Sequence, residues 1–158
     1  MIKMLSKHFS YAEAVKSSTA MRLGIPNVPD EPTLTTMVWF ANTIAERLRD
    51  LFGAFSPTSW FRCLKLNTAV GGSATSTHPK GNTIDFQIKG KKPIDVMKRI
   101  VASGIPFDQL IDEYDDWTHI SSMQDASKNR GQVLEYRHSN GCTKCRAIDV
   151  SNWEKNAK

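Results

Sequence analysis

The sequence has few cysteines and no long apolar run. Only 3 of its 158 residues are cysteine, and an odd number argues against a disulfide framework. The N-terminal stretch MIKMLSKHFSYAEAV has neither an apolar core nor a small-residue cleavage site, so we expect no signal peptide and no transmembrane span. We find no repeat, long linker or low-complexity tract. These absences favour a single globular domain that spans residues 1–158. A chain of this length can form a hydrophobic core without disulfide bonds.

The charge of the chain bears on its partners. The net charge is +5 and the pI is about 9.2, which favours anionic partners such as nucleic acid, anionic lipid or an anionic cell wall. The basic residues are scattered, apart from KGKK at residues 89–92, which is typical of a solvated turn. Because no aromatic residues are interleaved with basic ones, we rank nucleic-acid binding low, and we expect no membrane insertion.

The residue patterns predict an α+β fold with a central, mainly antiparallel sheet and flanking helices. Ser10 and Glu13 fit a capping box ahead of a short helix. Apolar residues at helical spacing predict a long helix from Thr33 to Phe52, ended by Gly53. A second helix follows Pro93. Strands are predicted over residues 82–88, 107–114, 116–122 and 131–138.

Two histidines and two aspartates are the candidates for chemistry: His78, Asp85, Asp116 and His119. Taken alone, each histidine is typical of a hydrogen-bonded structural residue. Asp85, however, interrupts the apolar run of a strand, and a buried carboxylate needs a partner or a metal. Two neutral imidazoles and one carboxylate suit zinc, and a second carboxylate would serve as general base. Because residues three apart on a strand face opposite sides, Asp116 must lie on the turn before His119 to take that role.

Longer stretches of the chain resemble a known family. The segment STHPKGNTID, followed later by DWTHIS, is similar to the zinc D-Ala-D-Ala carboxypeptidases, which share a fold with lysostaphin-type enzymes and the hedgehog signalling domain. The family pattern is S-x-H-x-x-G-x-x-x-D, then a carboxylate, two residues and a histidine. The segments KHFSYAEAVKSSTAMRLGIPN, SWFRCLKLNTAVGGSATSTH and FDQLIDEYDDWTHIS extend the likeness. It covers roughly residues 7 to 123 and leaves 124–158 as an extension of unknown role.

This resemblance implies roles for the candidate residues. It implies that His78, Asp85 and His119 bind Zn²⁺ and that Asp116 is the catalytic base. Many family members carry glutamate at that last position. Gly81 would let the chain turn sharply between His78 and the strand that bears Asp85.

The resemblance also implies two substrate contacts. Arg62 matches the arginine that holds the substrate carbonyl or the developing oxyanion, for which a guanidinium offers a fixed fork of donors. Ser76 would contact substrate, and the alternative for its hydroxyl is to cap the loop.

The implied function is hydrolysis of peptide bonds in peptidoglycan stem peptides by a zinc peptidase. The bond is D-Ala-D-Ala for a carboxypeptidase, or an internal L-Ala-D-Glu link for an endopeptidase. The closer likeness within the family is to small phage and bacterial members. Together with the compact chain, the lack of a signal and the basic charge, it leads us to expect a phage endolysin or virion-associated lytic enzyme. It would be held in the host cytoplasm before release to the wall, and we expect a monomer. The alternative is a catalytically silent zinc-binding recognition module of the same fold.

One further motif stands outside this reading. Cys142 and Cys145 form a single C-x-x-C near His138. These supply three ligands of a second metal site, whereas a structural zinc site takes four. The other interpretation is a tight loop near the C-terminus.

Overall fold

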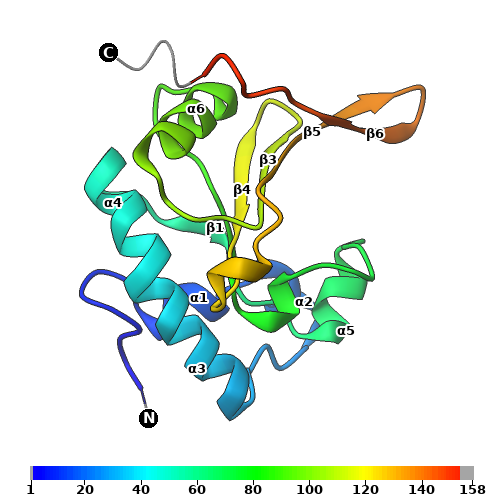
Figure 1. Cartoon of the computed structure of the whole chain (residues 1–158). Helices are drawn as coiled ribbons and strands as arrows, with labels where there is room; N and C mark the ends of the chain where they lie inside the picture. Colours follow the sequence, from blue (N-terminus) through cyan, green and yellow to red (C-terminus); the bar gives the residue numbers. More distant parts are fainter. Residues whose placement is uncertain (1, 154–158) are drawn as a thin grey trace.

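The computed structural model of the chain describes residues 2–153 (Figure 1). Its centre is a six-stranded sheet with the order β1-β2-β4-β3-β5-β6. Adjacent strands are antiparallel except for β3 and β5, which are parallel. The predicted α+β fold with a mainly antiparallel sheet is confirmed. The strands are β1 (Pro57–Ser59), β2 (Thr83–Phe86), β3 (Gln109–Glu113), β4 (Trp117–Ser121), β5 (Gln132–Ser139) and β6 (Cys142–Ala147).

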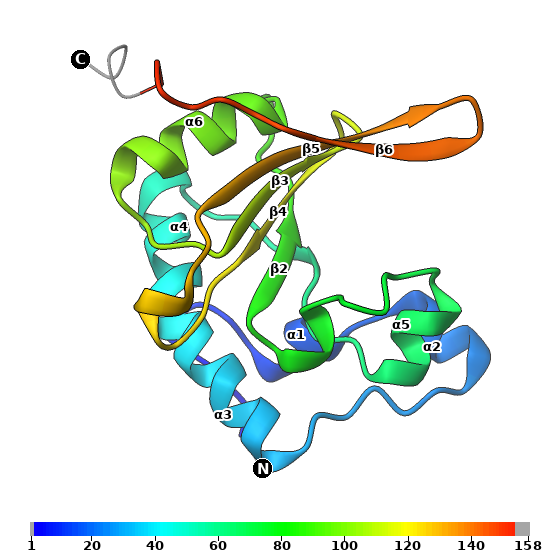
Figure 2. The same cartoon turned by 45° about the vertical axis from the view of Figure 1, so that its right-hand side comes forward.

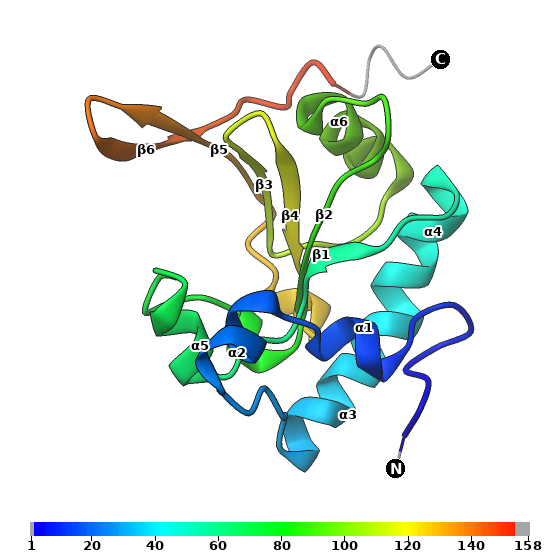
Figure 3. The same cartoon turned by 180° about the vertical axis from the view of Figure 1, so that it is seen from behind.

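Three short helices lie together beyond the β1 edge of the sheet (Figure 3). The first begins at the predicted capping box: the Ser10 hydroxyl accepts from the Glu13 backbone N–H, and the Glu13 carboxylate accepts from the Ser10 N–H. None of the helices in the described range is long and apolar enough to cross a membrane. These short helices are α1 (Tyr11–Val15), α2 (Ser18–Leu23) and α5 (Leu64–Ala69).

The predicted long helix consists of three continuous segments. These are α3 (Glu31–Phe40), a π-helical turn (Ala41–Ala45) and α4 (Glu46–Phe52). The helix begins two residues earlier than predicted because the Asp30 carboxylate accepts from the Thr33 N–H at 3.0 Å and caps it. It ends at Gly53 as predicted, where φ is 81°.

The two faces of the sheet have different neighbours. Helices α3, α4 and α6 (Pro93–Ser103) cover one face, as Figure 2 shows. Ile84 and Phe86 of β2 are buried in that core with Leu110 and Ile120 of the neighbouring strands. Because side chains alternate along a strand, Asp85 between them points to the other face. That open face carries the polar candidates.

Strands β5 and β6 form a hairpin that projects from the body of the molecule (Figure 2). The turn consists of Asn140 and Gly141, with φ values of 51° and 77°. Two central residues with positive φ are typical of a type I′ turn, which favours Asn-Gly. The C-terminal region around Cys142 is therefore a strand and not the loop predicted from the sequence.

Candidate metal centre and active site

Asp85 and His119 lie opposite each other on neighbouring strands. The antiparallel pairing of β2 with β4 puts them in direct register, so both side chains stand on the open face of the sheet. The Nδ1 atom of His119 is 2.8 Å from Oδ1 of Asp85. Both residues are buried, with 7% of their surface exposed. Strand pairing thus brings together two residues that are 34 positions apart in the chain.

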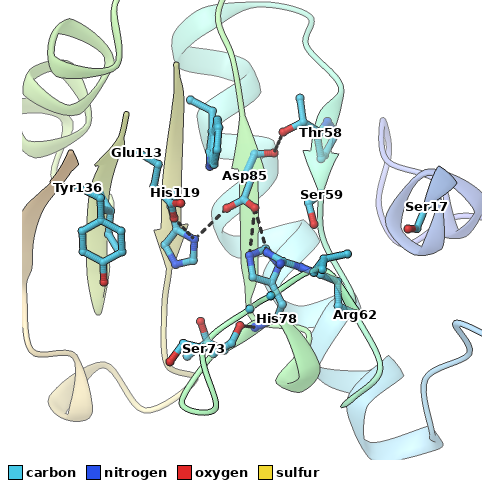
Figure 4. A pocket seen from close by; sticks show the side chains of 18 of the residues that line it. Ser17, Thr58, Ser59, Arg62, Ser73, His78, Asp85, Glu113, His119 and Tyr136 are labelled. Atoms are coloured by element: carbon cyan, nitrogen blue, oxygen red, sulfur yellow. Dashed lines mark hydrogen bonds and ion pairs between the residues drawn. The ribbon is translucent and has the colours of Figure 1, made fainter. Parts of the chain in front are cut away.

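His78 reaches the same point from a 3₁₀ turn (His78–Lys80) that ends at Gly81, where φ is 77°. Its Nδ1 donates to the Trp60 carbonyl oxygen at 2.5 Å. Since a carbonyl only accepts, Nδ1 carries the proton and Nε2 carries a lone pair. That Nε2 is buried without a hydrogen-bond partner and lies 3.2 Å from Oδ2 of Asp85 (Figure 4). Two electron-rich atoms therefore face each other.

Electrostatics keeps His78 neutral and Asp85 ionised. Burial lowers the pKa of His78, against the opposing attraction of the Asp85 carboxylate. Burial alone would raise the pKa of Asp85, but the hydrogen bond from His119 holds it below its usual range. The result is a neutral imidazole beside a carboxylate, which are the forms that bind a metal ion.

His78, Asp85 and His119 fit a zinc site, and we call them the three-ligand centre. Their ligand atoms all lie within 4.8 Å of one another. Two imidazoles and one carboxylate leave the fourth tetrahedral position open. The separation of 3.2 Å between Nε2 of His78 and Oδ2 of Asp85 is close to the edge of about 3.3 Å expected for a tetrahedron with bonds of about 2.0–2.1 Å. The sequence-predicted ligands are thus brought together.

Glu113, which sequence reasoning missed as a site residue, stands next to the three-ligand centre. It ends β3, and its Oε1 is 3.5 Å from Nδ1 of His119. Burial, reinforced by the Asp85 carboxylate, raises the pKa of Glu113 to about 6, although His119 and Arg62 act in the opposite direction. A carboxylate with such a pKa can both take up and return a proton near neutral pH.

Asp116, the predicted base, lies elsewhere. It is on the turn between β3 and β4, as expected, but it is exposed and does not line the cavity. Its Oδ1 accepts from Nε2 of Gln87 at 2.5 Å. Asp116 lies in the turn at residues 114–116, outside both strands, and its backbone carbonyl also accepts from Nε2 of Gln87 at 3.1 Å. Asp116 is thus held away from the cavity, whereas Glu113 stands beside the three-ligand centre.

The two predicted substrate contacts both line the cavity. Nη2 of Arg62 is 3.1 Å from Oδ2 of Asp85, and its Nε is buried without a hydrogen-bond partner. The Ser76 hydroxyl accepts from the His78 backbone N–H at 3.3 Å. Ser76 therefore caps the loop that carries His78, which was the alternative interpretation of this residue.

The candidate second metal site does not form. Cys142 and Cys145 are free and exposed on β6, three residues apart, so their side chains point to opposite faces. His138 instead stacks on Tyr114, with ring centroids 4.2 Å apart. Within residues 2–153, the three-ligand centre is the one group of histidine, cysteine and acidic residues arranged to hold a metal.

The three-ligand centre opens into a cavity of about 1000 Å³, large enough for a peptide ligand. A family model described as Peptidase M15 matches residues 7–121, close to the range of 7 to 123 over which the sequence resemblance was seen. No curated protein matches the chain. The matched segment is well over half of the chain and contains the whole three-ligand centre and Glu113. The chain therefore belongs to the peptidase M15 family, that of the zinc D-Ala-D-Ala carboxypeptidases.

Proposed function

We propose that the protein is a zinc-dependent peptidase that hydrolyses peptide bonds in the stem peptides of peptidoglycan. The observation that carries the proposal is the convergence of three ligand atoms within 4.8 Å of one another in a chain of the M15 family. Zn²⁺ bound there would polarise the peptide carbonyl and make a water molecule more acidic. The remaining chemistry belongs to side chains around the centre.

Glu113 is the general base in this proposal. Its Oε1 lies 3.5 Å from Nδ1 of His119. The Glu113 carboxylate therefore stands beside the metal ligands and is not one of the three. This carboxylate can take the proton of the attacking water. The protonated acid then gives that proton to the leaving amine nitrogen.

Arg62 stabilises negative charge on the substrate oxygen. One of its nitrogens holds the Asp85 carboxylate at 3.1 Å, which fixes the guanidinium at the centre. Arg62 also lines the cavity, so the guanidinium borders the space in which a substrate would lie. A guanidinium fixed before substrate binds needs little reorganisation as charge develops on the carbonyl oxygen.

The charge of the whole chain supports a cell-wall substrate. A net charge of +5 raises the local concentration of the protein near an anionic wall. We propose that the protein acts in bacterial lysis as a phage endolysin or virion-associated enzyme. We also propose that it acts as a monomer. The bond cut is D-Ala-D-Ala or an internal link of the stem peptide such as L-Ala-D-Glu.

A catalytically silent zinc-binding module is the alternative. It needs the three-ligand centre but neither a general base nor a substrate cavity. Glu113 beside the ligands and the cavity of about 1000 Å³ favour an enzyme.

Digestion of purified peptidoglycan tests the proposal. We expect the zinc-loaded protein to release new peptide termini, identified by mass spectrometry, and a chelator to stop their release. Zinc restored in excess of the chelator should bring the products back. If zinc-loaded protein leaves both peptidoglycan and isolated stem peptides intact, the proposed function is wrong.

A further inference from the structure

The cavity extends to both sides of the three-ligand centre. Figure 4 shows Glu113 and then Tyr136 on one side of it, and Ser59 and then Ser17 on the other. These residues come from successive strands and from the start of α2, so the row runs across the strand directions. A site that removes only a terminal residue needs room for just one residue on one side of the centre. This cavity extends in two.

One side of the cavity comes from the hairpin β5–β6, which follows the segment matched by the family model. Tyr136 of β5 is in register with Glu113 of β3, so the two stand next to each other on the open face. Thr143 of β6 lies beside them, with its Oγ1 3.1 Å from the Tyr114 hydroxyl. All four side chains line the cavity, and we call this side the hairpin wall.

The hairpin wall is fixed in place before any substrate binds. Two buried carboxylates at the ends of β3 each receive two hydrogen bonds from an arginine of the hairpin region. Arg130 donates to Asp108 at 2.9 and 2.5 Å, and Arg137 donates to Asp112 at 2.9 and 2.7 Å. Bidentate pairs of this kind restrict geometry as well as adding energy. Tyr136 lies between these two anchors along the chain.

The hairpin wall is chemically unsuited to a terminal carboxylate. Among the described cavity-lining residues the lysines and arginines are Arg62, which holds Asp85, and Lys16, which precedes Ser17 on the far side. The hairpin wall instead offers phenol, hydroxyl and aromatic groups next to the acidic Glu113. Such groups bind neutral peptide backbone through hydrogen bonds and ring contacts.

We propose that the substrate peptide lies across the strands with residues bound on both sides of the scissile bond, and that Tyr136 binds the residues on the hairpin side. This inference rests on the proposed function and specifies it: the bond cut is internal, and the protein is an endopeptidase. Burial, with the Cys145 thiol and the Glu113 carboxylate nearby, raises the pKa of Tyr136. The phenol therefore stays protonated and able to donate to a peptide carbonyl.

The position of the cut tests the first half of the inference. Stem peptides with a free C-terminus and the same peptides as C-terminal amides are digested by the zinc-loaded protein, and the products are identified by mass spectrometry. We expect cleavage at an internal bond of both, at rates within about twofold of each other, because residues bound on both sides of the scissile bond put the peptide's C-terminus away from the three-ligand centre. Release of a single C-terminal residue, abolished by the amide, would overturn the inference and leave the proposed function standing. No cleavage of any peptide would refute both.

A pair of tyrosine variants tests the second half. Tyr136→Phe removes one hydroxyl from the hairpin wall, and Tyr11→Phe removes one from α1, outside the cavity. We expect Tyr136→Phe to lower kcat/KM about five- to tenfold, mainly through KM, which is the loss of one hydrogen bond. The zinc content of both variants should match that of the wild type, and so should the kcat/KM of Tyr11→Phe.

Truncated substrates locate the contact. Peptides shortened stepwise from the N-terminal end and from the C-terminal end are compared between Tyr136→Phe and the wild type. In one of the two series, the difference in kcat/KM between Tyr136→Phe and the wild type should disappear at a particular truncation. That truncation removes the substrate residue that Tyr136 binds. Equal kcat/KM for the two proteins on the full-length peptide, or a difference that survives both truncations, would overturn the role of Tyr136.

Discussion

The Nε2 atom of His78 lies 3.2 Å from Oδ2 of Asp85, and it has no hydrogen-bond partner. The Trp60 carbonyl holds the proton of this imidazole on Nδ1, at 2.5 Å, so the ring cannot turn its N–H toward Asp85. A buried polar atom left without a partner costs about 1–3 kcal/mol. A cation between the two atoms removes this cost, and metal binding should therefore stabilise the fold.

Zinc should raise the melting temperature. At a free zinc concentration 100 times Kd, the gain is about 2.7 kcal/mol, or roughly 5–10 °C for a chain of this size. Asp85→Asn should lose most of this shift, because the amide keeps the shape of the side chain and removes the negative ligand. Asp50→Asn is the matched control, since Asp50 is an exposed aspartate outside the cavity. A zinc shift of equal size in Asp85→Asn, measured by thermal unfolding with and without chelator, would contradict the proposed ligand set.

Gly81→Ala should destabilise the turn that carries His78. A Cβ at this position would lie 2.5 Å from Cγ of Met37, and φ is +77°. We expect a loss of about 2–4 kcal/mol in the free energy of unfolding, from the clash together with the unfavourable backbone conformation. Gly90→Ala has nearly the same φ, +75°, but meets nothing within 4 Å, so it should lose about 1 kcal/mol. Urea unfolding of both variants measures the difference, and equal losses would remove the role of the Met37 contact.

The Asp108–Arg130 pair should make the free energy of unfolding depend on pH in the acidic range. Hydrogen bonds from Arg130 hold the pKa of Asp108 below its ordinary value of about 3.8. The carboxylate therefore stabilises the fold above that pH, and this contribution is lost as the pH falls below it toward the folded-state pKa. Asp108→Asn should cost about 2 kcal/mol at pH 7 and less at pH 3. Urea unfolding at the two pH values checks this, and a cost independent of pH would show that the ionised form is not what matters.

The three ligands of the metal centre could be predicted from the sequence because each lies in a short, recognisable segment. His78 and Asp85 lie on the two sides of a Pro/Gly turn, and His119 lies within a strand that pairs with the one carrying Asp85. The resemblance to a known family joined these segments, and the structure shows how pairing of β2 with β4 does so physically.

The position of Glu113 beside the ligands could not be predicted in the same way. Asp116 precedes His119 by three residues and matches the family spacing, but in the turn its side chain accepts from Gln87 and does not line the cavity. Trp117 and His119 share the open face with Glu113 because Glu113 and Trp117 are in register across the β3–β4 hairpin. That register depends on the turn, where Tyr114 and Asp115 have φ values of 63° and 58°. A turn of this kind is not evident from Glu-Tyr-Asp-Asp, which lacks glycine.

The C-terminal hairpin was missed for a different reason. Asn140 and Gly141 form the two-residue turn that most strongly indicates a hairpin, and this signal was present in the sequence. The adjacent C-x-x-C of Cys142 and Cys145 is also compatible with a metal site or a loop. The strand after the turn is also polar and exposed along its whole length, so the alternation that usually marks a strand is absent.

Zinc content and turnover, measured on the same samples of Glu113→Gln and Asp116→Asn, test the central claim most directly. Both variants replace a carboxylate by an amide of the same shape. We predict that Glu113→Gln keeps one zinc per chain but loses at least about 100-fold in kcat on peptidoglycan peptides, because the general base is gone. Asp116→Asn should keep both zinc and activity within about twofold, since Asp116 is exposed and bonded to Gln87. Full activity in Glu113→Gln, or its loss in Asp116→Asn with zinc retained, would contradict this account.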